Sequence, residues 1–264
     1  MMKIESLYIF VFVIVLCSCG KGSSRVKEDS VVPYDSTIVF FDIGEGSRED
    51  ISIAIDRLDA LGPRVLGVYS IFTSWNGSHE DSLLVFSLYN AKKIILVSFI
   101  SDDRSTYEKS HRYFTGPATG VGVSSFLEHE SGIVNAFIPL VGIATEGQML
   151  SFPELIAYNY SDEASKKFHT LSQNEVKEIE LIKNLNEFLV LDYNHLNRET
   201  VEGKIVILGE FKKSLEDLFF METKEGQLVE VPGIVVEANI ILNRLFKQGD
   251  GRQIKNRAIT GSNY

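Results

Sequence analysis

Residues 37–70 read TIVFFDIGEGSREDISIAIDRLDALGPRVLGVYS, and the pattern of this segment changes from that of a strand to that of a helix and back. The run TIVFFDI is rich in β-branched and aromatic residues and too short for a buried helix, so it predicts a buried strand. Ser47 and Asp50 then have the spacing of a capping box, and apolar residues recur at helical intervals until Gly62-Pro63. The next apolar run, Val65 to Ser70, predicts a second strand.

The same alternation continues to residue 100. Ser78 and Asp81 repeat the capping arrangement before a leucine-rich helix, and Lys93 to Ile100 is a third apolar run. Alternating helices and wholly apolar strands are typical of parallel strands joined by right-handed crossovers and covered by helices. We therefore predict an α/β fold in a single domain, with a mainly parallel sheet and helices on both faces.

The rest of the chain predicts elements in a less regular order. We expect an outward loop at residues 101–117, and a charged, exposed insertion at residues 161–184. The strands Val121–Phe126 and Ile133–Leu140 are expected to pair with each other around the turn at Glu130-Ser131-Gly132. The remaining expected elements are a helix at Phe152–Tyr160, strands at Phe188–Asp192 and Lys204–Leu208, and a final helix that begins at Pro232-Gly233.

The N-terminus has the pattern of a bacterial export signal. Residues 7–17, LYIFVFVIVLC, form an unbroken apolar run after a short leader that contains Lys3. The run is much shorter than the roughly twenty residues that span a bilayer, but it fits the core of a signal peptide. Leu16-Cys17-Ser18-Cys19 resembles the lipobox of bacterial lipoproteins, which implies a signal peptide at residues 1–18 and a lipid on Cys19. The alternatives are an ordinary secretory signal cleaved nearby and a buried hydrophobic helix.

The predicted lipid sets the expected location. Two or more acyl chains anchor a protein stably, so we expect attachment to the cell envelope through Cys19. Gly20 rather than Asp follows this cysteine, which by the same resemblance favours the outer membrane of a Gram-negative cell, facing the periplasm or the exterior. Residues 19–36 are then a polar tether, residues 37–247 the folded domain and residues 248–264 a polar tail.

Composition argues against several classes of function. The formal net charge of -10 and the pI near 5.1 do not suit nucleic-acid binding, which requires a basic face. The five histidines are scattered and match no metal-ligand motif. Cys17 leaves with the signal and Cys19 carries the lipid, so no thiol remains for catalysis or metal binding. We therefore expect no metal and no cofactor.

Several motifs follow one another along the chain in a fixed order. The front motifs are a strand with Asp42, a helix that begins near Arg48, a second strand, and Asp81 before a leucine-rich helix. The middle and end motifs are Gly132-Ile133-Val134-Asn135, Phe137-Ile138-Pro139, VEGKIVILG, Asp217-Leu218-Phe219 and VPGIVVEANIILNRL. In this order the motifs resemble the CHASE2 family of bacterial extracytoplasmic sensory domains. The resemblance covers most of Thr37 to Lys247 and implies a sensory domain that binds and does not catalyse.

The chain also departs from the family pattern. A tryptophan-proline pair often follows the first strand in the family and is absent here, and Glu237 stands where the last helix often has histidine. Usual members continue into transmembrane helices and a cyclase or kinase, whereas this chain ends at Tyr264. We therefore expect it to act in trans, on a separate envelope protein.

Carboxylates near strand ends are the first candidates for a site, because open parallel sheets gather binding groups at their carboxyl edge. Asp42, Glu45 and Asp217 have this placement, and we expect Asp42 and Asp217 to converge on a polar ligand. The alternative is structural, with each carboxylate capping a helix or pairing with a cation such as Arg48 or Lys204. Gly44-Glu45-Gly46 lacks the further glycine and lysine of a phosphate-binding loop, which favours a tight turn.

Trp75 lies in a loop before the second helix and is either a contact residue or packed over the sheet edge.

Together these patterns favour a lipid-anchored binding module with an envelope protein partner, and an unknown small ligand remains open. One rival is an envelope hydrolase that uses Asp42 and Asp217 as paired carboxylates. The other is a solute-binding lipoprotein that supplies a transporter.

Overall fold

The structure is a computed structural model that describes residues 37–100, 107–129, 131–167, 170–211 and 218–246. Contacts divide the chain into two units, Met1–Val32 and Pro33–Tyr264, and every described residue belongs to the second unit. Three predictions fall outside the described residues: the signal peptide with Cys19, the tether, and the polar tail. The candidate residue Asp217 lies outside them as well.

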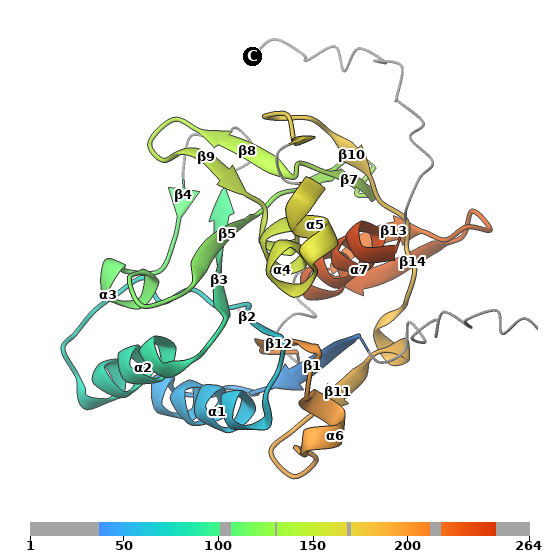
Figure 1. Cartoon of the computed structure of the whole chain (residues 1–264). Coiled ribbons are helices and arrows are strands. Elements are labelled where there is room, and N and C mark those ends of the chain that lie inside the picture. Colours follow the sequence, from blue (N-terminus) through green and yellow to red (C-terminus); the bar gives the residue numbers. More distant parts are fainter. Residues whose placement is uncertain (1–36, 101–106, 130, 168–169, 212–217, 247–264) are drawn as a thin grey trace, which may run out of the picture. The chain divides into compact units, whose positions relative to one another are not determined.

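The main sheet has seven strands in the order β11-β1-β12-β2-β3-β4, with β5 also paired to β3 (Figure 1). All pairs are parallel except β3 with β4, so the predicted α/β fold with a mainly parallel sheet is confirmed. The strands are β1 (Ile38–Asp42), β2 (Val65–Val68), β3 (Ile94–Ile100), β4 (Tyr107–Glu108), β5 (Gly120–Ser124), β11 (Leu189–Leu191) and β12 (Ile205–Gly209).

The first two helices begin where the sequence predicts. Ser47 caps α1 (Arg48–Leu61) and Ser78 caps α2 (His79–Asn90), each in a complete capping box with an aspartate at the third helical position. Gly62 ends α1 in the left-handed conformation, with φ of 77°. A side chain rarely adopts this conformation, which explains the glycine before Pro63.

Side chains of β1 alternate between two buried hydrophobic clusters. Val39 and Phe41 belong to the cluster that contains residues of α1 and α2. Ile38 and Phe40 belong to the cluster that contains residues of α4 (Phe152–Tyr160) and α7 (Gly233–Phe246). This two-residue period explains why the strands are apolar throughout, since neither set of side chains faces water.

Glycine allows α4 to approach the sheet closely. A Cβ atom built on Gly122 of β5 would lie 2.4 Å from the Cα atom of Phe152, which no side chain tolerates. Ser151 caps α4, and Pro153 occupies its first turn, as the sequence predicts. The helix therefore begins directly against the middle of β5.

Two expectations for the middle of the chain are wrong in part. Residues 120–124 do not pair with the strand near residue 134, because β5 joins the main sheet beside β3. Only β6 (Phe126–Glu128) pairs with β7 (Val134–Phe137) around the predicted turn. The expected outward loop contains β4 and α3 (Arg112–Thr115) within its described part. Phe114 explains this, since its buried side chain holds α3 against the cluster of α1 and α2.

The expected exposed insertion also packs in part against the core. Its later residues Ile179, Leu181 and Lys183 are buried, because α7 binds the backbone of this segment through Asn239 and Asn243. Two hairpins were not expected from the sequence, β8 with β9 and β13 with β14. The remaining elements are β8 (Leu140–Ile143), β9 (Gly147–Leu150), α5 (Asp162–Lys167), β10 (Lys177–Glu178), the 3-10 helix Leu185–Glu187, α6 (Arg198–Val201), β13 (Leu218–Glu222) and β14 (Leu228–Pro232).

Candidate functional site

An ion pair joins the first turns of α1 and α2. Arg48 is the first residue of α1, and its Nη1 donates a hydrogen bond to Oδ1 of Asp81, the third residue of α2. Arg48 Nη2 also donates to Ser74 Oγ at 3.1 Å. The side chain of Asp81 is 0% exposed, whereas that of Arg48 is 20% exposed. The arginine therefore both neutralises a buried carboxylate and reaches the surface.

Asp81 is held in its ionised form by several donors. Burial acts to raise its pKa, but hydrogen bonds from the Asn76 amide, the Arg48 guanidinium and the Ser78 amide outweigh burial and lower the pKa below its usual value. The Asn76 and Ser78 amides donate to Asp81 Oδ2 at 2.8 and 3.2 Å. A carboxylate with this many donors keeps its charge without contact with water.

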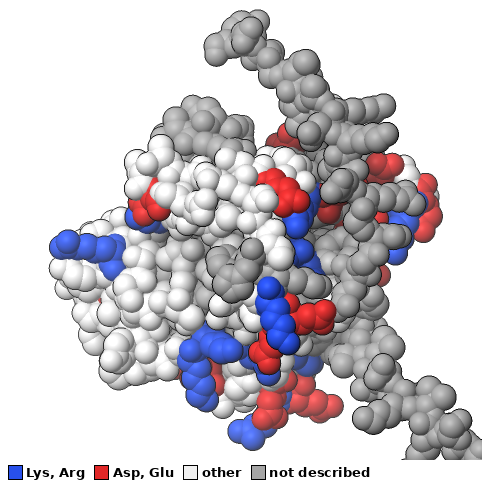
Figure 2. All heavy atoms as spheres, turned by 45° about the horizontal axis from the view of Figure 1, so that its top comes forward, with Lys and Arg blue, Asp and Glu red and all other residues white. Residues whose placement is uncertain are grey.

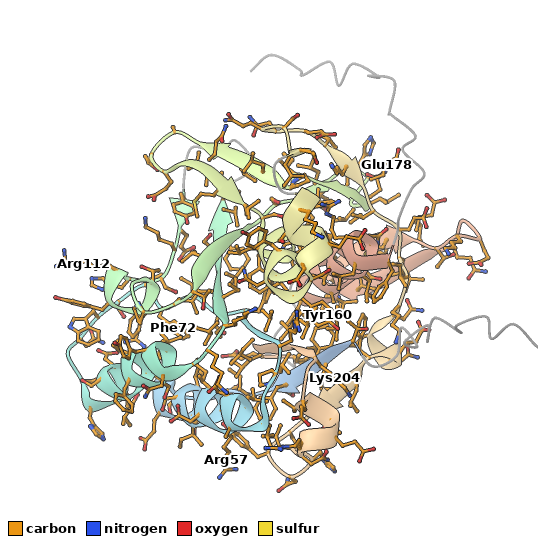
Figure 3. All side chains as sticks on the ribbon, in the orientation of Figure 1. Arg57, Phe72, Arg112, Tyr160, Glu178 and Lys204 are labelled. Carbon is orange, nitrogen blue, oxygen red and sulfur yellow. The ribbon has the colours of Figure 1, made fainter. Side chains whose placement is uncertain are left out.

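Three aromatic rings in contact with one another extend from Arg48. Its guanidinium carbon lies 5.2 Å from the centre of the buried Phe114 ring, and the Trp75 ring lies 5.7 Å from the same ring. The Tyr113 ring lies 4.7 Å from the Trp75 ring at a tilted angle, and Tyr113 is 45% exposed. We call Arg48, Trp75, Tyr113 and Phe114 the Arg–aromatic cluster. Figure 3 shows the neighbouring Arg112 pointing outward from α3, while Phe72 points inward.

The predicted carboxylates have a different environment. Asp42 ends β1, and its Oδ1 accepts hydrogen bonds from the backbone amides of Gly44 at 3.0 Å and Phe211 at 3.1 Å. Asp42 thus joins the ends of β1 and β12 instead of pairing with Arg48 or capping a helix. Glu45 is exposed in the turn between β1 and α1. Of the candidate residues that the structure describes, Arg48 and Trp75 both lie beside Phe114, whereas Asp42 ends β1 and Glu45 lies in the turn before α1.

Chemically, the Arg–aromatic cluster offers groups that suit recognition of a ligand or partner. Arg48 presents donors that suit carboxylate, phosphate or carbonyl oxygens, and the rings offer flat apolar contact area. Hydrolysis by paired carboxylates requires two carboxyl groups roughly 5 to 10 Å apart in an open cleft. Asp42 Oδ1 already accepts two amide hydrogens. No observation among the described residues therefore favours the hydrolase over a binding role.

A second buried carboxyl group was not predicted as part of a site. Glu237 on α7 is 0% exposed, and Ser124 Oγ at the end of β5 donates to its Oε1 at 2.5 Å. Glu237 Oε2 has no hydrogen-bond partner in the part of the chain that the structure describes. Burial raises the pKa of Glu237 to about 8, against the lowering effect of Ser124. A signal was present in the sequence, since Glu237 interrupts the apolar run GIVVEANIIL.

Hollows in the described surface lie elsewhere. One of about 480 Å³ is lined by residues of β7, of the segment after β10, and of the end of β13 with the turn between β13 and β14, namely Asn135, Ile179, Glu180, Glu222, Thr223 and Lys224. A neighbouring hollow of about 250 Å³ shares Thr223 and Lys224. Neither hollow is lined by a residue that the sequence proposed for the site.

Among the described residues, no group of three or more His, Cys, Asp or Glu side chains is arranged to hold a metal ion. None of the helices in the described ranges is both long enough and apolar enough to cross a membrane.

Comparison with known proteins gives one match. The family model of the CHASE2 domain matches residues 41–259, which is most of the 264-residue chain. No curated protein and no solved structure matches the chain. CHASE2 is a family of extracytoplasmic sensory domains, and the match begins in β1 and includes every later element of the described fold. The motif resemblance is thereby confirmed: this chain belongs to the CHASE2 family.

Proposed function

We propose that this chain is a lipid-anchored, extracytoplasmic sensory or binding module that acts through an envelope partner in trans and does not catalyse a reaction. The observation that carries the proposal is the CHASE2 match over residues 41–259. The N-terminal lipobox pattern supports the lipid anchor. In this proposal residues 37–247 form a single module with helices on both faces of its sheet, held by a tether at residues 19–36.

The lipid anchor can be tested by labelling cells with palmitate. We expect label in the full chain and none in a Cys19→Ser variant, because the thioether can form only on that sulfur. Cys17→Ser is the matched control, since the neighbouring cysteine leaves with the signal peptide, and this variant keeps the label. An unlabelled wild-type chain in cells that export it normally would contradict the anchor. Fractionation of the labelled cells then tests the outer-membrane location.

The contact surface is proposed to lie around the carboxyl edge of the sheet, at Asp42, Glu45, Arg48, Trp75 and Asp217. The Arg–aromatic cluster supports it, because Trp, Tyr and Arg dominate the binding energy of protein interfaces. Figure 2 turns the top of Figure 1, toward which β3 points, to the viewer. Charged side chains are sparse over part of the described surface in this view.

Crosslinking in intact envelopes, followed by affinity purification, tests the partner. We expect Trp75→Ala to weaken partner recovery at least about tenfold, as loss of a central aromatic contact does. Tyr89→Ala on α2 is the control, because Tyr89 is also an exposed aromatic but lies outside the Arg–aromatic cluster. Recovery of other copies of this chain alone would count against a partner in trans.

A further inference from the structure

Glu237 is a buried carboxyl group with one unpartnered oxygen among the described residues. It lies on α7, where every residue from Gly233 to Asn243 is buried. Its single hydrogen bond comes from Ser124, and its second oxygen has no partner within the described ranges. Buried polar groups are almost always paired, so an orphaned carboxyl oxygen calls for an explanation.

The other polar attachments of α7 are complete. Asn239 accepts hydrogen bonds from the amides of Ile182 and Lys183 and donates to the carbonyls of Lys183 and Val235. Asn243 donates to the carbonyl of Glu180. These amide groups do not titrate, so their hydrogen bonds to residues 180–183 do not themselves respond to moderate changes of pH.

The titratable and charged groups around α7 do not neutralise Glu237. On α4, Glu154 already forms a two-pronged ion pair with Arg244, with distances of 2.5 and 2.7 Å, and Tyr160 packs nearby. Lys183, in the segment beside the helix, donates to the Glu187 carbonyl. The sheet contributes Tyr69 and Ser124, and the hairpin β13–β14 contributes the apolar residues Met221 and Val231. Within the described residues, burial and Ser124 are the two influences on the pKa of Glu237, and no described charged group offsets its burial.

We propose that the protonation of Glu237 controls the attachment of α7 to the main sheet. As a neutral acid, Glu237 keeps α7 in contact with Ser124 at the end of β5, and loss of its proton opens this contact to water. We call this contact between Glu237 and Ser124 the latch. A buried carboxylate without a cation costs several kcal/mol unless water or a donor reaches it. The helix must therefore shift or loosen to hydrate the charge. The dissociated proton goes to solvent, and no other reactant is needed.

The latch connects the main sheet, through Ser124, with α7, through Glu237. Ser124 is the last residue of β5, at the carboxyl edge of the main sheet. The hairpin strand β14 runs directly into α7, and both strands of the hairpin contact this helix. Release of α7 therefore changes the position of the hairpin against the sheet. This inference goes beyond the proposed function, because it supplies the module with a response to mildly alkaline pH.

The direction of the pH effect follows from the two pKa values. The pKa of Glu237 rises from 4.5 to about 8 on folding, so the folded state binds the proton more tightly than the unfolded chain does. Its contribution to stability is complete below about pH 4.5, falls as pH rises, and is lost once pH passes about 8. Each pH unit inside this window changes the folding equilibrium by up to about tenfold.

Unfolding of the full chain by denaturant, from about pH 5 to about pH 9.5, tests the stability effect. We expect the unfolding constant of the wild type to rise relative to that of Glu237→Gln by up to about tenfold per pH unit, and to level off above about pH 8. Glu199→Gln on α6 is the matched control, because Glu199 is exposed, and its ratio to the wild type stays flat. A flat ratio for Glu237→Gln as well would overturn the proposal.

Two further measurements on the wild type separate a latch from a merely structural acid, and Glu237→Gln serves as the reference for the first of them. The infrared carbonyl band of a protonated carboxylic acid is expected at neutral pH and lost above about pH 8, and it is missing in Glu237→Gln. Hydrogen exchange of α7 amides, relative to those of α1, is expected to accelerate over the same range. Loss of the infrared band with no change in relative exchange would show a buried acid that does not control α7, and would refute the latch.

Discussion

Asp81 and Glu237 are both fully buried carboxyl groups in one domain, yet their pKa values move in opposite directions. Asp81 accepts hydrogen bonds from Arg48 and from two backbone amides, and its pKa is lowered despite its burial. Glu237 accepts one hydrogen bond, from Ser124, and burial raises its pKa to about 8. Burial alone therefore does not determine the charge of a carboxyl group, because the number of available donors decides the outcome.

Position within the helix explains the difference in donors. Asp81 is the third residue of α2, where backbone amides lack intrahelical partners and the helix dipole favours a negative charge. Glu237 is the fifth residue of α7, where helical hydrogen bonds already use the amides. The position of Asp81 in the first turn suits a permanent charge that binds an arginine. The position of Glu237, farther into its helix, suits a group that changes its protonation.

The largest effect should come from removing the cation beside Asp81. Arg48→Met keeps much of the side-chain volume but leaves a buried carboxylate without its ion pair, so we expect Tm to fall by roughly 10 °C. Thermal unfolding measured by circular dichroism checks this. Arg57→Met is the matched control on the same helix, because Arg57 is exposed and points outward from α1 (Figure 3). Equal Tm values for the two variants would show that the backbone donors alone satisfy Asp81.

A smaller effect is expected when Glu237 loses its donor. Ser124→Ala should lower the stability by about 1 kcal/mol, which corresponds to a fall in Tm of roughly 2 to 4 °C. Because the Ser124 hydrogen bond lowers the pKa of Glu237, its loss should also move the infrared titration midpoint upward from about 8.

Ser125→Ala is the control for this variant. Ser125 is also buried, and its hydroxyl donates to the carbonyl of Ile138 at 2.7 Å. The two variants should therefore lose similar stability, but only Ser124→Ala should shift the midpoint. A shift of the same size in both would mean that the midpoint reports a general loosening of β5.

The sequence contains a local pattern for Asp81 but none for Glu237, so the structural context of the two carboxyl groups could not be predicted equally well. The capping spacing of Ser78 and Asp81 is local, so the start of α2 could be predicted correctly. Pairing of Asp81 with Arg48 joins residues 33 positions apart through the packing of α1 on α2, which no local pattern contains. Glu237 stood out only as a departure from the family pattern, and its bond to Ser124 joins residues 113 positions apart.

The same distinction applies to the fold. The strands and helices of residues 37–100 were predicted because each is marked by its own apolar run or cap. The hairpins β8–β9 and β13–β14 were missed, since β8 has only four residues and β9, β13 and β14 are exposed or half-buried at most positions. The burial of Ile179 and Leu181 depends on Asn239 and Asn243, whose partners lie far away in the chain. Short-range sequence patterns therefore predict the helices and strands. The site depends on polar contacts between residues far apart in the sequence, which such patterns do not predict.

The smallest effect is expected for Asp50. This residue distinguishes the influence of helix position from that of burial, because it shares the helix position of Asp81 but is exposed. Asp50 occupies the same third position on α1 as Asp81 on α2, but it is exposed and its partner is Ser47. The Ser47 amide and hydroxyl lower the pKa of Asp50 below 3.8, so its contribution is present above that pH and is lost as pH falls through the lowered pKa. We expect Asp50→Asn to lower Tm at pH 7 by only roughly 1 to 2 °C, because solvent screens the charge and the amide oxygen still accepts a hydrogen bond. Melting curves at neutral and strongly acidic pH check this, since the two chains should converge in acid. A loss as large as that of Arg48→Met would mean that helix position, and not the arginine, explains why Asp81 remains charged.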